Sequence, residues 1–250
     1  MILTVRKTDL LNIVINSFYP HRCVLCDKVI EQNRFLCSDC MYVPKHISSD
    51  VCFKCGVRKN KCRCKTVRYH FRAVVAPFWY EGKIKDAFLK FKFDGATEYA
   101  DYFANEMTKV VKRIYGNITF DAIAYVPTTK KKIHSRGYNQ CEVLANKISN
   151  IISVPIEHKA LEKLIDNQTQ HTLTREERVQ NVRNAYACGC DLTGKTVLLI
   201  DDIKSSGATL NECAKQLLLG GADTVYCAVA LLNSSNSDKE LAKSTVKQYT

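Results

Sequence analysis

One stretch decides the fold: TVLLIDDIKSSGATL, residues 196–210. After Thr196, residues 197–200 form a short apolar run, which is typical of a buried strand in a parallel sheet. Asp201 and Asp202 follow directly, so we expect them at the carboxyl end of that strand, where open α/β sheets bind ligands. The segment after Gly207 is predicted to be a helix that reaches about Leu219. The stretch therefore predicts a ligand site at the edge of a parallel sheet.

The loop between this strand and this helix is suited to a phosphate. Backbone N–H groups at a helix N-terminus attract anions, and small hydroxyl side chains add donors. The two aspartates can then accept hydrogen bonds from sugar hydroxyls or hold Mg²⁺ indirectly. The loop has the glycine spacing of neither a Walker loop nor a GxGxxG turn. The alternative interpretation of the Asp-Asp pair is a solvated turn. The candidate phosphate-ligand residues are Asp201, Asp202, Ser205, Ser206, Gly207, Ala208 and Thr209.

Strand and helix patterns alternate through the last two thirds of the chain. Such alternation is typical of βαβ units and indicates an α/β fold with a parallel sheet flanked by helices. We expect strands at 73–80, 122–127, 196–201 and 224–232, and helices at 84–93, 97–115, 138–151 and after residue 207. Near the N-terminus, residues 4–18 have the apolar spacing of a short amphipathic helix.

The 13 cysteines are unevenly distributed, and eight of them lie between residues 23 and 64. Two CxxC turns present four sulfurs to one ion, the tetrahedral geometry that suits zinc. We therefore predict two zinc ions. Consecutive pairing gives two successive ribbons and interleaved pairing a cross-brace, and both stay open; a redox or iron–sulfur role is the minor alternative. His21 and His46 flank the cysteines and are expected to be bystanders. The predicted metal ligands are Cys23, Cys26, Cys37, Cys40, Cys52, Cys55, Cys62 and Cys64.

Charge and compartment also follow from composition. The formal net charge is +12, and residues 1–70 hold 13 Lys/Arg against 5 Asp/Glu. Such an excess favours solubility or a polyanion partner. Nothing in the sequence has the length of a membrane span or an uninterrupted signal-peptide core, and the odd number of cysteines argues against a disulfide framework. We expect a cytoplasmic protein.

Further segments narrow the interpretation. VPTTKKK (126–132) leads into RGYNQ (136–140), and a later region carries Gln168, Thr169, Leu173, Arg175, Arg178, Asn181 and Val182. With the paired cysteines, these segments resemble the ComF family of competence proteins over roughly residues 20–232. Within this match, residues 196–210 resemble the phosphoribosyl-pyrophosphate (PRPP) motif of type I phosphoribosyltransferases. There, two acidic residues contact the ribose hydroxyls and the next loop holds the 5′-phosphate.

The resemblance implies a pyrophosphate loop with Thr128, Thr129, Lys130 and Arg136, and Mg²⁺ bound with PRPP. The basic residues 130–132 and Arg136 suit a pyrophosphate or a DNA backbone, and Arg175, Arg178 and Arg183 could close over the same pocket; a solvated basic face is the alternative. Some purine-salvage transferases carry an aspartate at the position of Ser205, so the serine here puts that acid–base step in doubt.

For function, the resemblance implies the handling of incoming single-stranded DNA in natural transformation. A DNA-translocating ATPase is the implied partner, with peripheral association with the inner-membrane uptake machinery. The alternative is an active phosphoribosyltransferase with an unknown acceptor base. We divide the chain into a helix plus double zinc-ribbon module at 1–70, a phosphoribosyltransferase-like domain at 71–233 and a polar tail at 234–250.

Overall fold

The structure is a computed structural model that describes residues 20–233 except 49, 63, 65–66 and 166–181. The helix predicted at 4–18, the polar tail and most of the later ComF-like region lie outside the described residues. The chain divides into two compact units, Met1–Lys45 and His46–Thr250. Within the described residues, no helix is both long and apolar enough to cross a bilayer.

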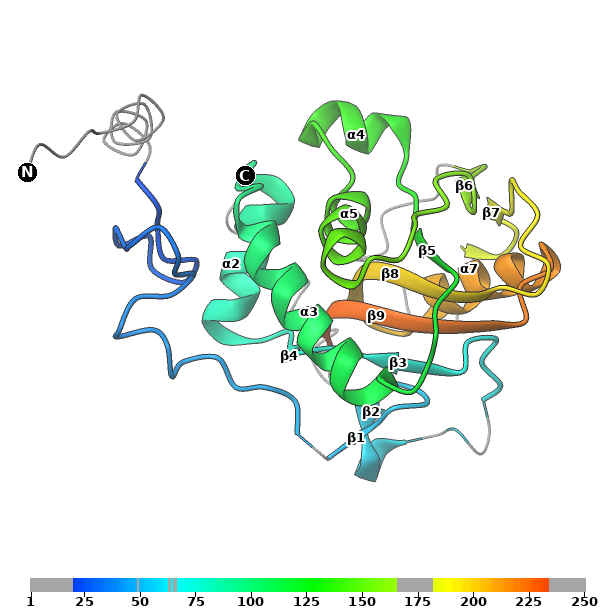
Figure 1. Cartoon of the computed structure of the whole chain (residues 1–250), viewed down its shortest axis with the longest axis horizontal. Coiled ribbons are helices and arrows are strands. Elements are labelled where there is room, and N and C mark those ends of the chain that lie inside the picture. The colour runs from blue at the N-terminus through cyan, green and yellow to red at the C-terminus, as the bar shows by residue number, and fades with distance from the viewer. Residues whose placement is uncertain (1–19, 49, 63, 65–66, 166–181, 234–250) are drawn as a thin grey trace, which may run out of the picture. The chain divides into compact units, whose positions relative to one another are not determined.

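A parallel sheet forms the centre of the larger unit (Figure 1). Its strand order is β3 (Ala73–Val75), β9 (Thr224–Leu232), β8 (Thr196–Lys204) and β5 (Ala122–Tyr125), and β4 (Phe78–Trp79) also pairs with β9. Every pairing in this sheet is parallel. Residues 197–200 of β8 are fully buried, as expected for a strand that has neighbours on both edges and helices on both faces. The predicted fold class is confirmed.

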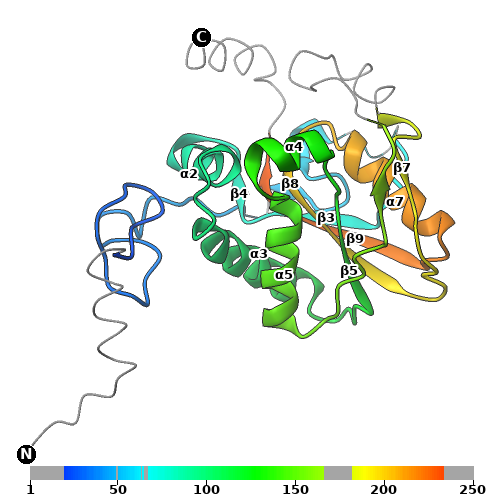
Figure 2. The same ribbon diagram turned by 90° about the horizontal axis from the view of Figure 1, so that it is seen from above.

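Helices cover both faces of this sheet (Figure 2). One face packs against α3 (Tyr99–Tyr115) and α5 (Gln140–Ile152), with α2 (Gly82–Phe93) packed on α3, and the other face packs against α7 (Ala208–Leu219). Side chains alternate along β9: the Tyr226 ring lies 5.0 Å from the Tyr115 ring of α3, whereas Val225 and Cys227 share a core cluster with Leu217 of α7.

Several elements differ from the sequence prediction. The strand expected at 73–80 is two short strands, because Pro77 between them has no N–H to donate to the sheet. The strand expected at 196–201 continues to Lys204. The pyrophosphate-loop region contains an additional helix, α4 (Lys130–Arg136), and β6 (Glu162–Lys163) pairs with β7 (Tyr186–Ala187) in an antiparallel ladder that was not predicted.

The second set of cysteines lies in the larger unit and packs on the sheet. Its hairpin, β1 (Val51–Cys52) and β2 (Val57–Arg58), is antiparallel, and a short 3₁₀ helix (Lys59–Lys61) follows. Val74 N–H of β3 donates to Phe53 O at 2.6 Å. The Arg58 guanidinium lies 4.4 Å from the centre of the Trp79 ring. The compact units therefore divide before His46, whereas the domain boundary proposed from the sequence comes after residue 70; that domain division stays a prediction.

Candidate functional site: two cysteine clusters and the carboxyl end of β8

The eight predicted metal ligands gather in two separate groups of four. Within each group the sulfurs all lie within 4.8 Å of one another, and all thirteen cysteines are free thiols. The groups consist of consecutive cysteines, which favours two successive ribbons over a cross-brace. Their members are Cys23, Cys26, Cys37 and Cys40 in the first, and Cys52, Cys55, Cys62 and Cys64 in the second.

The sulfur spacing fits zinc. Four thiolates at about 2.3 Å from a tetrahedral Zn²⁺ lie about 3.8 Å from one another. The Sγ–Sγ distance is 3.7 Å for Cys26 and Cys37, and also for the pairs Cys52–Cys64 and Cys55–Cys62. An all-sulfur tetrahedron selects soft or borderline ions such as zinc over Mg²⁺ or Ca²⁺. Both sites therefore have the donor type and the spacing of structural zinc centres.

The same backbone turn forms each CxxC pair. In all three pairs, two successive N–H groups, of the second cysteine and the residue after it, donate to the carbonyl of the first cysteine. After the first and third pairs the chain turns left-handed, at Asp27 (φ 61°) and Gly56 (φ 65°). His46 is not a ligand, because its Nε2 pairs with Glu106 Oε2 at 2.6 Å.

The aspartate pair lies near the carboxyl end of β8, two to three residues before the strand ends at Lys204 rather than directly after it. Asp201 is 6 % exposed, and its Oδ1 accepts the N–H of Asp202 at 2.8 Å and the thiol of Cys141 at 3.4 Å. Asp202 Oδ1 accepts the N–H of Ile203 at 2.6 Å. The two carboxylates are therefore held by the backbone of their own strand end and by the start of α5.

Their environments drive the two carboxyl pKa values apart. Burial, and then the neighbouring Asp202 charge, raise the pKa of Asp201 to about 7. Burial also opposes ionisation of Asp202, but the charge and hydrogen bond of Lys92 outweigh it and lower the pKa of Asp202. Lys92 pairs directly with Asp202 Oδ2, and both side chains are largely buried. Opposed pKa values in adjacent carboxyl groups are a feature of binding and catalytic sites.

Lys92 was not identified by the sequence, and the RGYNQ segment explains its position. Lys92 lies in the last turn of α2, whose final carbonyls are held by side chains of that segment. Tyr138 OH donates to Phe91 O, and Gln140 Nε2 donates to Lys92 O at 3.0 Å. These bonds fix the end of α2 and place the ammonium of Lys92 at Asp202.

The other residues of the segment complete the same corner. The Arg136 guanidinium lies 4.7 Å from the centre of the Phe93 ring. Burial lowers the pKa of Arg136, and the charge of Asp202 partly offsets this, which places a second cation near the carboxylates. Asn139 Nδ2 donates to Val126 O at 3.2 Å, directly after β5, while its Oδ1 accepts the N–H group of Cys141, the second residue of α5, at 3.1 Å.

The predicted pyrophosphate loop follows β5 at the same edge of the sheet. Val126 N–H donates to Ile200 O, so the loop begins beside Asp201. Thr129 is buried and caps α4, accepting the N–H of Lys132 at 3.3 Å. Thr128 is half-buried, whereas Lys130, Lys131 and Arg183 are exposed.

The phosphate loop leads into α7 through Gly207, which is left-handed with φ 81°. Ser206 Oγ accepts the N–H of Ala208 at 3.3 Å. The N-cap residue of α7 is Gly207, which has no side chain to cap the helix. The N-terminal N–H groups and the dipole of α7 therefore favour an anion at residues 205–209.

Direct Mg²⁺ binding is poorly supported by the described ligands. Cys141, Asp201 and Asp202 have donor atoms within 4.8 Å of one another. Burial raises the pKa of Cys141 well above its usual value, and a neutral thiol is a poor ligand for a hard cation. Asp202 is already paired with Lys92. The carboxylates are better suited to ribose hydroxyls or to a metal-bound water.

Two family models match the chain: a double zinc ribbon domain over residues 14–67 and a phosphoribosyl transferase domain over residues 139–249. Along the chain, a match to a double zinc ribbon is thus followed by a match to a phosphoribosyl transferase domain. The matches agree with the two sulfur tetrahedra and with the carboxylate-and-loop arrangement at the end of β8.

Curated relatives span most of the chain. The DNA utilization protein YhgH of Shigella flexneri is 25 % identical over 206 residues, which cover 81 % of this chain and 86 % of the relative. Competence protein ComFC of Bacillus subtilis (strain 168) is 24 % identical over 234 residues, covering 85 % and 95 %. Competence protein ComFC of Streptococcus pneumoniae is 27 % identical over 195 residues, covering 76 % and 84 %. The resemblance to the ComF family is confirmed.

Solved structures give a distant match. A glutamine PRPP amidotransferase from B. subtilis, complexed with ADP and GMP, has a TM-score of 0.36 and 18 % identity over 59 % of this chain and 33 % of that chain. A purine phosphoribosyltransferase from Pyrococcus horikoshii has a TM-score of 0.33 and 15 % identity, covering 54 % and 83 %.

Proposed function

We propose that this protein handles incoming single-stranded DNA during natural transformation, and that its transferase-type pocket binds PRPP or a related phosphorylated ligand. The observation that carries the first part is the similarity to two ComFC competence proteins, which covers 85 % and 76 % of this chain. The name of the YhgH relatives points to DNA as well. The excess of positive charge over residues 1–70 supports a polyanion partner.

The proposed ligand pocket is formed by three groups of residues. Asp201 and Asp202 would accept hydrogen bonds from the ribose hydroxyls. Residues 205–209 would hold the 5′-phosphate, and Thr128, Thr129, Lys130 and Arg136 would contact the pyrophosphate. Mg²⁺ bound with PRPP would neutralise part of the pyrophosphate charge when present.

Lys92 would change partners when the ligand binds. In the ligand-free chain its ammonium neutralises Asp202. A ribose hydroxyl that approaches Asp202 competes with this ammonium, and an arriving phosphate offers Lys92 a stronger anionic partner. We infer that Lys92 exchanges the carboxylate for a ligand phosphate, which leaves Asp202 available to the sugar.

The second candidate function is catalysis by an active phosphoribosyltransferase. It is favoured by the assembled carboxylate pair with Lys92 and Arg136 nearby, because stabilising pyrophosphate as it departs requires cations in this place. Ser205, where some transferases have an aspartate, gives no acid–base group for the acceptor. We therefore place catalysis second.

The clustered free thiols also bear on the cellular compartment of the protein. Eight clustered free thiols that bind zinc require a reducing compartment, so we propose a cytoplasmic location. A DNA-translocating ATPase and the inner-membrane uptake machinery are the proposed partners.

Calorimetric titration of the full chain with PRPP and Mg²⁺ tests the pocket. The double variant Asp201→Ala/Asp202→Ala should lose measurable binding, since charge-assisted hydrogen bonds contribute about 1.5–3 kcal/mol each. Unchanged affinity in this variant would remove the pocket assignment. Pyrophosphate release over a panel of bases then separates the two functions, because only an active transferase releases it in the presence of an acceptor.

Binding of a fluorescent single-stranded oligonucleotide tests the DNA function. If the contacts are electrostatic, log affinity should fall linearly with log salt, by about 0.7 per phosphate neutralised. The absence of binding at low salt would contradict the proposal. Transformation frequency in a naturally competent host, with and without the intact gene, tests the biological role.

A further inference from the structure

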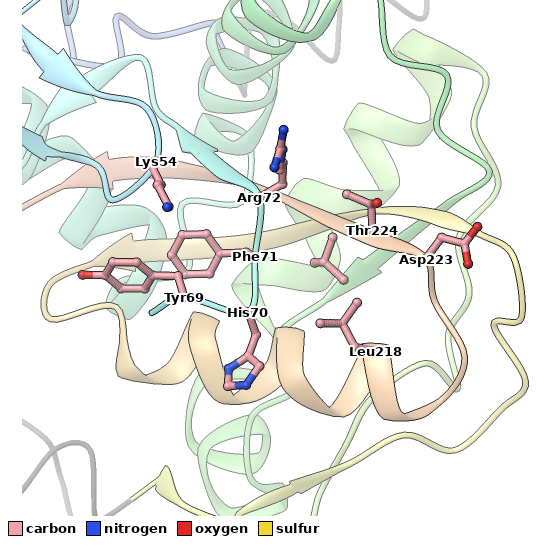
Figure 3. Close-up of a pocket in the computed structure, with 9 residues that line it drawn as sticks. Lys54, Tyr69, His70, Phe71, Arg72, Leu218, Asp223 and Thr224 are labelled. Carbon is pink, nitrogen blue, oxygen red and sulfur yellow. The ribbon is translucent and has the colours of Figure 1, made fainter. Parts of the chain in front are cut away.

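A second concave site lies on the α7 side of the sheet, away from the aspartate pair. This groove has a volume of about 630 Å³ and is lined by Lys54, residues 69–72, Leu218 and residues 223–225. Figure 3 shows the Tyr69 and Phe71 rings side by side, His70 beside α7, and Lys54 and Arg72 on the opposite side from Leu218. None of the residues proposed for the PRPP pocket lines it.

The lining of the groove is mixed, and part of it is aromatic and apolar. Phe71 is only 2 % exposed, and Val225 is buried beside it at the start of β9. The half-buried Tyr69 ring lies 4.9 Å from the Phe71 ring at an interplanar angle of 32°. Aromatic rings on a groove floor stack with nucleic-acid bases, and they tolerate any sequence because every base has a π-face.

The charge at the edge of the groove complements a phosphodiester backbone. Lys54 lies in the turn between β1 and β2, and Arg72 lies directly before β3; both are exposed and have no acidic partner among the described residues. Arg68, next to Tyr69 in the chain, is exposed as well. The acidic residue Asp223 lies at the other end of the groove, at the start of β9. We therefore expect phosphates at the Lys54–Arg72 side only.

The groove lies between the second cysteine cluster and the back of the phosphate loop. Lys54 is inside the third CxxC turn, so a metal in this cluster would fix the backbone that carries it. His70 N–H donates to Asn211 Oδ1, in the first turn of α7, at 2.7 Å. A Cβ added at Gly207 would lie 3.9 Å from Tyr69 Cε1. The aromatic platform is thus held against the helix that begins at the phosphate loop.

We propose that this groove binds single-stranded DNA, with a base stacked on Tyr69 and the adjoining phosphates on Lys54 and Arg72. The inference rests on the proposed DNA function, and it names the contact surface: the second cysteine cluster together with α7. Stacking on the half-buried Tyr69 ring requires an unpaired base, because a base inside a duplex is already stacked on both sides. A single strand is therefore preferred to a duplex.

Fluorescence anisotropy with the full chain and labelled oligothymidylate measures this contact. Lys54→Ala/Arg72→Ala should weaken binding and lower the slope of log affinity against log salt by about 1.4, since each lost phosphate contact removes about 0.7. Lys112→Ala/Arg113→Ala removes the same charge from exposed positions of α3 on the opposite face, and it should leave the slope unchanged. A duplex of equal length should bind more weakly than the single strand.

Substitution of Tyr69 separates stacking from charge. Tyr69→Ala should weaken binding roughly five- to 150-fold, which corresponds to about 1–3 kcal/mol of base stacking, with the salt slope unchanged. Tyr69→Phe keeps the ring and should bind like the parent chain, which controls for loss of fold. Photo-crosslinking of the parent chain to an oligonucleotide that contains 5-iodouracil should label the peptide that includes residues 69–72.

Different results contradict the two proposals. If the parent chain does not bind the oligonucleotide at low salt, the DNA function fails. If it binds, but the groove variants keep parental affinity and slope, or the crosslinks lie only outside the groove, then the DNA function stands and the groove assignment is wrong. Equal competition by free thymidine monophosphate at the same nucleotide concentration would also overturn it, because it would indicate a mononucleotide site.

Discussion

Replacing each of the two adjacent aspartates by asparagine should change stability in opposite directions. Asp201→Asn keeps the shape of the side chain and an oxygen that can accept the Asp202 N–H group, but it removes a buried charge beside another carboxylate. Asp202→Asn instead removes the partner of Lys92 and leaves that ammonium buried without its counterion. We expect the first variant to be more stable than the parent chain at pH 8 and the second to be less stable.

The magnitude follows from the pKa of Asp201. Its folded value of about 7 lies above the ordinary 3.8, so the folded chain binds this proton more tightly than the unfolded chain does. Stability is therefore lost as pH rises from about 4 to 7, by at most about 4 kcal/mol at about 1.4 kcal/mol per pH unit. The asparagine variant does not incur this loss, so its advantage should grow by about 2 kcal/mol between pH 5.5 and pH 8.

The pKa of Asp202 is shifted in the opposite direction. Its folded pKa is lowered, so its contribution is complete above the ordinary pKa and is lost only as pH falls below it. Because the Asp202 charge also raises the pKa of Asp201, Asp202→Asn should destabilise the fold less at pH 8 than at pH 5.5. Breaking a buried ion pair on one side costs about 3–5 kcal/mol, which is an upper figure here because both side chains keep slight exposure.

Urea unfolding of both variants and the parent chain at the two pH values measures these differences. A loss of stability for Asp201→Asn at pH 8, or an advantage that does not depend on pH, would refute the assignment of a buried, uncompensated carboxyl group. The ligand assay provides a second readout: the stabilised variant should bind PRPP more weakly, as expected where stability is sacrificed for a binding group.

Three further predictions concern the metal sites, the backbone and Lys92. Metal analysis should find two zinc ions per chain, and one ion or none would contradict the two-site assignment. In thermal unfolding, Cys55→Ser should lower the temperature of the main transition, whereas Cys26→Ser should leave it unchanged. In urea unfolding, Gly56→Ala should destabilise the fold by about 1–3 kcal/mol more than Gly137→Ala. Both glycines are left-handed, but only a Cβ at residue 56 would meet neighbouring atoms, at 3.0 Å. An equal loss of stability in the two variants would show that this contact is harmless. Lys92→Met should raise the pKa of Asp202 and destabilise the chain more at pH 8 than at pH 5. Adding Asp202→Asn should recover part of the lost stability. If the stability changes of the two single variants simply add in the double variant, the two side chains do not interact.

The sequence predicts the parts of this molecule that depend on local pattern. The apolar run before Asp201 and the glycine after Ser206 indicate strand, loop and helix in turn, and the structure confirms this order as β8, loop and α7. The CxxC spacing likewise predicts the sulfur clusters. In both cases the residues that act together are close in the chain, so spacing alone brings them together.

Lys92 could not be found in this way. It is one of several lysines in α2, and no spacing separates it from Lys85 or Lys90. Its role depends on the end of α2 being held by Tyr138 and Gln140, which are almost fifty residues away in the chain. RGYNQ was recognised as a signature, but its side chains act on carbonyl groups of another helix, and that relation exists only in the folded chain.

The division into domains shows the same limit. Four cysteine pairs within residues 23–64 suggest one N-terminal module, yet the second cluster packs on the transferase-type sheet. Lys204 packs between the second cysteine cluster and the loop before α7. Its buried side chain lies between two glycines: a Cβ at Gly56 would approach its Cδ at 3.3 Å, and a Cβ at Gly207 would approach its Cε at 3.0 Å. One glycine follows a metal-ligand cysteine and the other belongs to the phosphate loop. We therefore expect loss of an ion from the second cluster to disturb packing against the loop proposed to hold the phosphate.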